Sequence, residues 1–167
     1  MEQYAASAPA VGLSPTAPAV AALLFHDVVY DPRSSTNEED SAVMAGAAAR
    51  ELLPPSYDAA RLTQLIMFTK HGVAAPDGAD VEGCFLVDVD LSILGRSWDV
   101  FAVYDAGIRA EYAWYPVEAF REGRRGVLAR FLDEPAIYRT RAMRDAYEAP
   151  ARANLRRAIE ELTSART

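Results

Sequence analysis

Two short stretches of this 167-residue chain place residues that can bind a metal ion inside strongly apolar sequence. His26 and Asp27 follow directly on one apolar run, and Asp88 and Asp90 lie within a second. A buried unpaired charge is costly, and a divalent cation held between imidazole and carboxylate groups would remove that cost. We therefore predict a metal site formed by His26, Asp27 and one of the two later aspartates. The alternative is that His26 caps a helix end and that the acids pair with arginines or face solvent.

A third stretch, Thr69-Lys70-His71, joins the only lysine of the chain to one of its two histidines. In this position Lys70 could contact a phosphate group, and His71 could donate a proton or add a metal ligand. The alternative is simpler, since the dipole at the C-terminus of a helix favours nearby cations.

Helical spacing of apolar residues recurs along the chain, whereas strand alternation is almost absent. The pattern predicts an all-α bundle of six to seven helices that has to position these residues. The pattern T-x-x-E, which begins at Thr36, predicts a capping box at the start of one helix. The run 81–94 could instead be a buried strand. The predicted helices cover about 18–30, 36–53, 58–70, 80–94, 97–115, 116–132 and 140 onward, with an interruption at Pro150 and a loop over 72–79.

Length and composition favour one domain over residues 1–167, in which residues 1–16 form a loose tail or the remnant of a truncated first helix. The formal net charge is −7, which argues against nucleic acid and against anionic membranes as partners. The single cysteine, Cys84, excludes an internal disulfide. A cytoplasmic protein is therefore expected.

Six stretches together resemble the HD superfamily of metal-dependent phosphohydrolases, in particular its small bacterial branch of predicted hydrolases. The HD pair alone has little weight, but the ordered set from residue 23 to residue 143 is specific. The stretches are LLFHDVVYDP (23–32), NEEDSA (37–42), TKHG (69–72), LVDVDLSILG (86–95), IRAEYAWYP (108–116) and IYRTRAM (137–143).

The resemblance implies an HD-domain-like helical fold with one divalent metal ion, such as Mn, Fe or Mg. The implied ligands are His26, Asp27 and Asp90, with Asp88 as the second choice. The family also carries an earlier ligand histidine in an upstream helix, and no histidine precedes His26 here.

Related hydrolases have the pattern HDxxED, which here reads HDVVYD, so Asp31 is kept while a tyrosine replaces the glutamate. The expected acid or base is therefore Asp31, with Glu38 or Glu39 as replacements. His71 is a further candidate for proton transfer.

The expected function is hydrolysis of a small phosphorylated metabolite or nucleotide, with Lys70 and Arg109 neutralising phosphate charge. One alternative is a degenerate HD-fold module that binds or regulates without turnover. Another is a helical interaction domain that uses exposed aromatic residues, although aromatics at helical spacing more often belong to the core. The aromatics concerned are Tyr104, Tyr112, Trp114 and Tyr115. Apolar surface left by an absent first helix would favour a homodimer.

Overall fold

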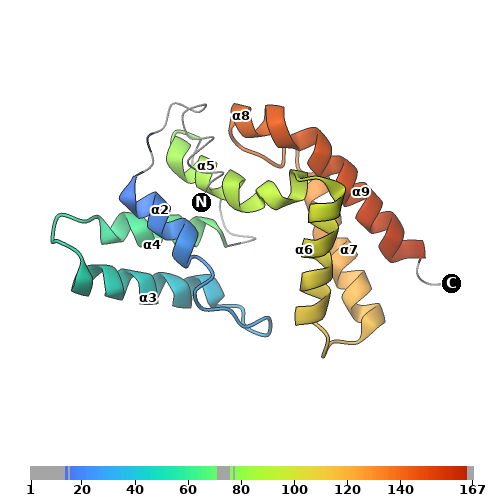
Figure 1. Cartoon of the computed structure of the whole chain (residues 1–167), viewed down its shortest axis with the longest axis horizontal. Helices are drawn as coiled ribbons and strands as arrows, with labels where there is room; N and C mark the ends of the chain where they lie inside the picture. The colour runs from blue at the N-terminus through green and yellow to red at the C-terminus, as the bar shows by residue number, and fades with distance from the viewer. Residues whose placement is uncertain (1–13, 15, 71–75, 77, 165–167) are drawn as a thin grey trace. The chain divides into compact units, whose positions relative to one another are not determined.

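The computed structural model describes residues 14, 16–70, 76 and 78–164, and no strand occurs among these residues (Figure 1). A 3₁₀ helix, Leu91–Gly95, continues from α5. The short helix α8, Arg141–Met143, and a π-helix, Arg144–Glu148, lead into the last helix. The described part contains seven α-helices of nine or more residues, which are α2 (Ala17–Phe25), α3 (Asn37–Leu52), α4 (Ala59–Phe68), α5 (Val81–Asp90), α6 (Trp98–Glu111), α7 (Val117–Asp133) and α9 (Ala149–Ser164). The prediction of an all-α bundle of six to seven helices is confirmed.

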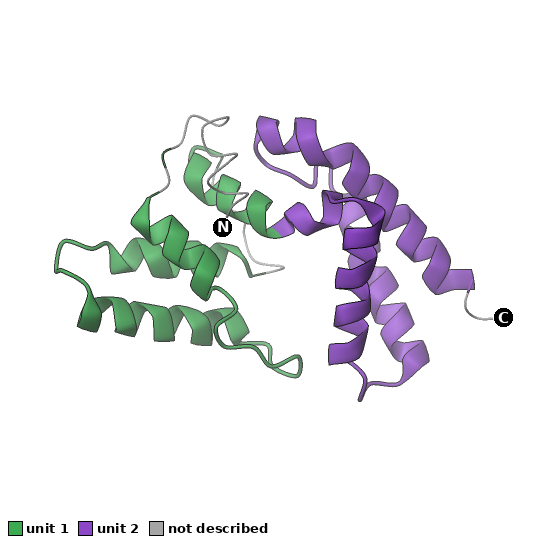
Figure 2. Ribbon diagram, in the orientation of Figure 1, with its two compact units in different colours: residues 1–90 green, residues 91–167 purple. Residues whose placement is uncertain are grey.

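The chain divides into two compact units, residues 1–90 and residues 91–167 (Figure 2). Unit 1 contains α2 to α5, and unit 2 contains the 3₁₀ helix and α6 to α9. The single domain over residues 1–167 stays a prediction. Among the helices that the structure describes, none combines the length with the apolar character that a membrane span requires.

Small residues allow the helices of unit 1 to approach one another closely. Helix α3 packs on α4, and α2 packs on both α4 and α5. At Gly46 of α3, an added Cβ would lie 2.6 Å from Thr63 Cγ2 of α4, so a larger residue would push the two helices apart. The buried face of α3 repeats at helical spacing and consists of Ser41, Ala42, Ala45, Gly46 and Ala49.

Unit 2 is organised around α9, which contacts α7 and the 3₁₀ helix. The buried Asn154 of α9 donates both of its amide hydrogens, to Leu94 O and to Arg96 O, each over 2.8 Å. Tyr138 is fully buried, and its hydroxyl donates to Leu91 O over 3.1 Å. The bonds from Asn154 satisfy carbonyl groups at the C-terminal end of the 3₁₀ helix and just beyond it, and the bond from Tyr138 adds a donor at its first residue.

The structure corrects several details of the predicted elements. The first helix ends at Phe25 and not near Tyr30, because the chain turns toward α3 after His26. The capping box at Thr36 is wrong: its hydroxyl makes no cap bond to the backbone and donates instead to Asp40 Oδ2 over 3.0 Å. The run 81–94 is helical, so its strand alternative is wrong. Most of the predicted tail over residues 1–16 and of the loop over 72–79 lies outside the described residues.

Candidate metal centre

The backbone at the end of α2 fixes the orientation of the His26 ring. The backbone N–H of His26 donates to Ala22 O over 2.9 Å, as in a continuing helical turn. Its ring Nδ1 lies 3.2 Å from Leu23 O. A carbonyl oxygen only accepts, so Nδ1 carries the proton of this bond, and Nε2 is the nitrogen left to face other groups.

Two carboxylates meet at Nε2 of His26. Asp27 Oδ2 lies 3.2 Å away, and so does Asp90 Oδ1 from the last residue of α5. The side chains of His26 and Asp90 are 19% and 24% exposed, whereas that of Asp27 is 61% exposed. The cluster therefore has one open side formed by Asp27. The structure brings together three residues predicted as ligands, with Asp90 beside His26, while Asp88 is fully buried.

The carboxylates dominate the charge state of His26. Burial by itself lowers the pKa of this ring, since it penalises the charged form. Hydrogen bonds to Asp27 and Asp90, together with their negative charges, act in the opposite direction and raise the pKa of His26 to about 10. Without a metal ion the ring is thus an imidazolium at neutral pH, bonded to two carboxylates.

The donor set fits a metal ion of the manganese or iron kind. One imidazole nitrogen and carboxylate oxygens suit these ions. Two ligands at right angles, each about 2.1 Å from one ion, lie roughly 3 Å apart, which is close to the two separations from Nε2. Within the described ranges, no group of three or more His, Cys, Asp or Glu side chains is placed so that it could hold a metal ion. Binding at His26 therefore requires loss of its Nε2 proton and a rearrangement of the side chains around it.

The loop after Asp27 is held by the first turns of α3. The hydroxyl of Ser41, which is fully buried, accepts from Val29 N over 3.1 Å and donates to Val29 O over 3.3 Å. Asn37 accepts from Asp31 N over 3.0 Å and donates to Asp31 O over 2.9 Å. The stretch 37–42 therefore has a structural role, since its bonds fix the path of the chain that follows Asp27.

The predicted acid–base residues have different surroundings. The carboxylate of Asp31 accepts the backbone N–H of Arg33 over 2.9 Å and so closes a turn in the same loop. Glu38 lies half-buried in the first turn of α3. His71 lies outside the described residues. The acid–base role of these three residues stays a prediction.

Lys70 and Arg109, the two predicted phosphate contacts, are both held by protein groups. Lys70 Nζ donates to Ser35 O over 2.8 Å and to Glu39 Oε1. The bond from Lys70 holds the pKa of Glu39 below its usual range. Arg109 lies in unit 2, where its Nη1 donates to Tyr112 O over 2.7 Å. Their role toward a phosphate stays a prediction.

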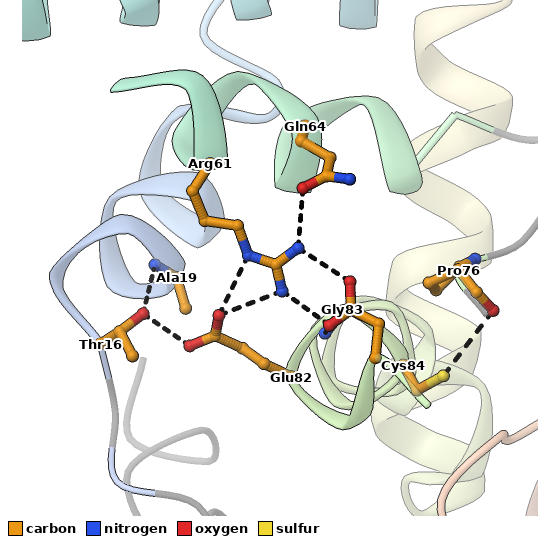
Figure 3. A network of polar contacts seen from close by, with 9 residues as sticks. Thr16, Ala19, Arg61, Gln64, Pro76, Glu82, Gly83 and Cys84 are labelled. Atoms are coloured by element: carbon orange, nitrogen blue, oxygen red, sulfur yellow. Dashed lines mark hydrogen bonds and ion pairs between the residues drawn. The ribbon is translucent and has the colours of Figure 1, made fainter. Parts of the chain in front are cut away.

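A network of ion pairs in unit 1 joins the helices that carry the cluster, and the sequence analysis missed it (Figure 3). Arg61 of α4 binds both oxygens of Asp80, over 2.6 and 2.8 Å, and binds Glu82 Oε2 over 3.2 Å. Thr16, the N-cap of α2, donates to Glu82 Oε1 over 2.5 Å. Arg61 thus links the N-terminal ends of α2, α4 and α5, whereas the C-terminal ends of α2 and α5 carry His26 and Asp90.

The aromatic residues weighed for an interaction surface are mostly exposed, contrary to the expectation that they belong to a core. The exposed fractions of Tyr104, Trp114 and Tyr115 are 38%, 47% and 40%. Tyr112 is half-buried and stacks on Trp114, with ring centroids 6.0 Å apart.

Comparisons with known proteins give no identification. No protein-family model, no curated protein and no solved structure matches the chain. A proposal about its function therefore depends on the geometry of the site and on the resemblance of its motifs.

Proposed function

We propose that the chain is a metal-dependent phosphohydrolase of the HD superfamily, acting on a small phosphorylated metabolite or nucleotide. The observation that carries the proposal is the meeting of Asp27 and Asp90 at Nε2 of His26, each over 3.2 Å. These are the ligands that the motif resemblance implies, and they come from two elements far apart in the sequence. The anchoring of the loop after Asp27 supports a site with a fixed framework.

His26, Asp27 and Asp90 would hold the ion, and the exposed side of Asp27 leaves room for substrate to approach. When bound, the ion lowers the pKa of a coordinated water and draws charge from a phosphoryl oxygen. Lys70 lies on Glu39 and can exchange that carboxylate for a phosphate oxygen of the substrate, because both are anionic acceptors for the same ammonium group. Asp31 and Glu38 are the carboxylates available to accept or return a proton near this loop.

A second candidate is a module with the same fold that binds or regulates without turnover. The observation that favours it is the pairing of His26 Nε2 with the carboxylates of Asp27 and Asp90, each over 3.2 Å. This pairing raises the pKa of the ring to about 10, and a ring that keeps its proton is a structural cation and a poor metal ligand. The paired state of Lys70 is also what a purely structural lysine would show. Metal binding and turnover distinguish the two candidates.

The test is an assay of the manganese-loaded protein against phosphomonoesters, phosphodiesters and nucleotides, with Asp27→Ala as the site variant. The matched control is Asp133→Ala, an exposed acid in the last turn of α7. The phosphohydrolase proposal expects phosphate release by the wild type and by the control, and loss of at least 100-fold in Asp27→Ala. Release that is the same in Asp27→Ala would overturn it. Bound manganese with no release from any ester would instead support the binding module.

A further inference from the structure

Unit 2 contains a cavity of about 360 Å³ between α6, α7 and α9. This volume is within the range of sites that bind small organic molecules. Its walls differ in character, with apolar side chains from all three helices and a few charged groups. The apolar lining consists of Trp98, Ala102, Ala106, Val117, Phe120, Ala158 and Leu162.

Arg109 provides a fixed cationic group in the wall of this cavity. Its Nη1 donates to Tyr112 O over 2.7 Å, and its guanidinium lies 4.8 Å from the centroid of the Phe120 ring. Among the described residues its Nε and Nη2 have no hydrogen-bond partner. A guanidinium that is oriented by a carbonyl and a ring, with donors left over, is prepared to bind an anion.

The remaining charges at the cavity are compensated within the unit. Asp105 is paired with Arg124 over 2.6 Å, and Glu161 is bonded to Arg157 over 3.0 Å. Arg121 is bonded to Glu118 over 2.7 Å. These three arginines and Arg109 exceed the three acids by one positive charge. A guest with a single negative charge would therefore complement the cavity.

The apolar wall defines the rest of that guest. Trp98 presents a large ring, one side of which is covered by the Arg157 guanidinium at 3.8 Å from the ring centroid. Three alanines, Ala102, Ala106 and Ala158, keep the space between the helices open, since larger side chains there would fill it. The cavity thus combines a flat aromatic surface and small aliphatic side chains with one anion anchor.

We propose that this cavity binds a small organic carboxylate with an apolar or aromatic body, the carboxylate on Arg109 and the body against Trp98 and Phe120. The proposal is independent of the metal site, which lies in unit 1. It gives Arg109 a ligand different from the phosphate predicted for it from sequence.

Sodium 4-phenylbutyrate is a suitable probe, with uncharged 4-phenylbutyramide as its matched control. The chain has only two tryptophans, so an ¹⁵N–¹H spectrum contains two indole N–H signals, and Trp114→Phe assigns that of Trp98. The proposal expects a saturable shift of the Trp98 signal by the carboxylate, with the amide at least tenfold weaker.

Two variants test separately the contact of the carboxylate with Arg109 and the space for the apolar part of the probe. Arg109→Gln should weaken the carboxylate at least tenfold, and Ala102→Leu should block it by filling the cavity while leaving Arg109 in place. Arg130→Gln, an exposed arginine of α7, should bind as the wild type does. No saturable shift at millimolar probe, equal binding of the amide, or unchanged binding by Ala102→Leu would each overturn the proposal. If Arg109→Gln does not fold, the comparison of carboxylate with amide decides the role of the charge.

Discussion

Substitution of Arg61 by methionine tests whether the ion-pair network holds together the helices that carry His26 and Asp90. Methionine keeps much of the apolar stem and removes the charge. In the variant, the negative charges of Asp80 and Glu82 repel each other, because the cation that compensated them is gone. The side chains of Arg61, Asp80 and Glu82 are 21%, 22% and 15% exposed, so the network is between a surface pair and a buried one.

The expected loss of stability follows from that intermediate burial. Breaking a fully buried pair costs about 3–5 kcal/mol, and an exposed pair is worth about 0–1 kcal/mol. For Arg61→Met we expect a loss of about 2 kcal/mol at pH 7. With a urea m-value of about 2 kcal/mol per molar, the unfolding midpoint falls by about 1 M.

The pH dependence of the stability difference tests whether the lost bond to Asp80 causes it. The hydrogen bond from Arg61 holds the pKa of Asp80 below its ordinary value of 3.8. A carboxyl group whose pKa is lowered by folding stabilises the folded state above its ordinary pKa, and this contribution is lost as the pH falls below that value. The difference between wild type and Arg61→Met should therefore be full at pH 6 and shrink toward pH 3.

The assay is urea unfolding followed by circular dichroism at pH 6, 5, 4 and 3, with Arg130→Met as the exposed control. The double variant with Asp80→Asn should show a coupling energy of about 1 kcal/mol or more. The reasoning is refuted if Arg61→Met unfolds within about 0.5 kcal/mol of the control, the scatter of ordinary surface substitutions. A difference that stays constant down to pH 3 would refute the assignment to Asp80.

Three further predictions concern other parts of the chain. In the presence of EDTA, NMR should show the His26 ring protonated above pH 8. Asp90→Asn should lower the pKa of His26, since one carboxylate no longer favours the charged ring. A wild-type ring that is neutral at pH 7 would contradict this prediction. Asn154→Leu should lose about 2 kcal/mol in urea unfolding, because Leu94 O and Arg96 O are left without their donor; an unchanged midpoint would contradict it. Gly126→Ala in α7 meets nothing within 4 Å and should raise stability by about 0.4–1 kcal/mol in thermal unfolding. Gly95→Ala, whose Cβ would lie 2.8 Å from Tyr147 O, should lower it, and equal effects at the two glycines would be inconsistent with the packing.

The sequence predicted the helices well where apolar spacing and prolines mark them. The third helix, with Asp58 as its N-cap, begins as expected, and its C-terminal boundary is close to the expected one. The ends were less predictable where long-range bonds compete with helical ones. The chain leaves α2 early because Val29 bonds to Ser41, and nothing within residues 18–30 indicates this partner. The predicted interruption at Pro150 is wrong, because Pro150 is the second residue of α9 and the chain stays helical through it. The irregularity lies just before it, in the π-helix Arg144–Glu148, which no local pattern indicated.

The meeting of His26, Asp27 and Asp90 was predictable to the extent that charge inside apolar sequence is unusual. That rule selected His26, Asp27 and the pair Asp88 and Asp90, but it could not choose between the last two. Positions two apart point to different faces of a helix, so the choice depends on how α5 is rotated against α2. Arg61 was not identified, because its partners are about twenty residues away on another helix and no local pattern connects them.

Binding of Mn²⁺, followed by the EPR signal of the free ion, tests the central claim most directly. We predict one saturable site per chain, accompanied by proton release since the His26 ring must lose its proton. Asp90→Asn should weaken the site at least tenfold, while Asp133→Asn should leave it unchanged. A wild-type chain without saturable Mn²⁺ binding, or a site of equal strength in Asp90→Asn, would contradict a metal centre formed by His26, Asp27 and Asp90.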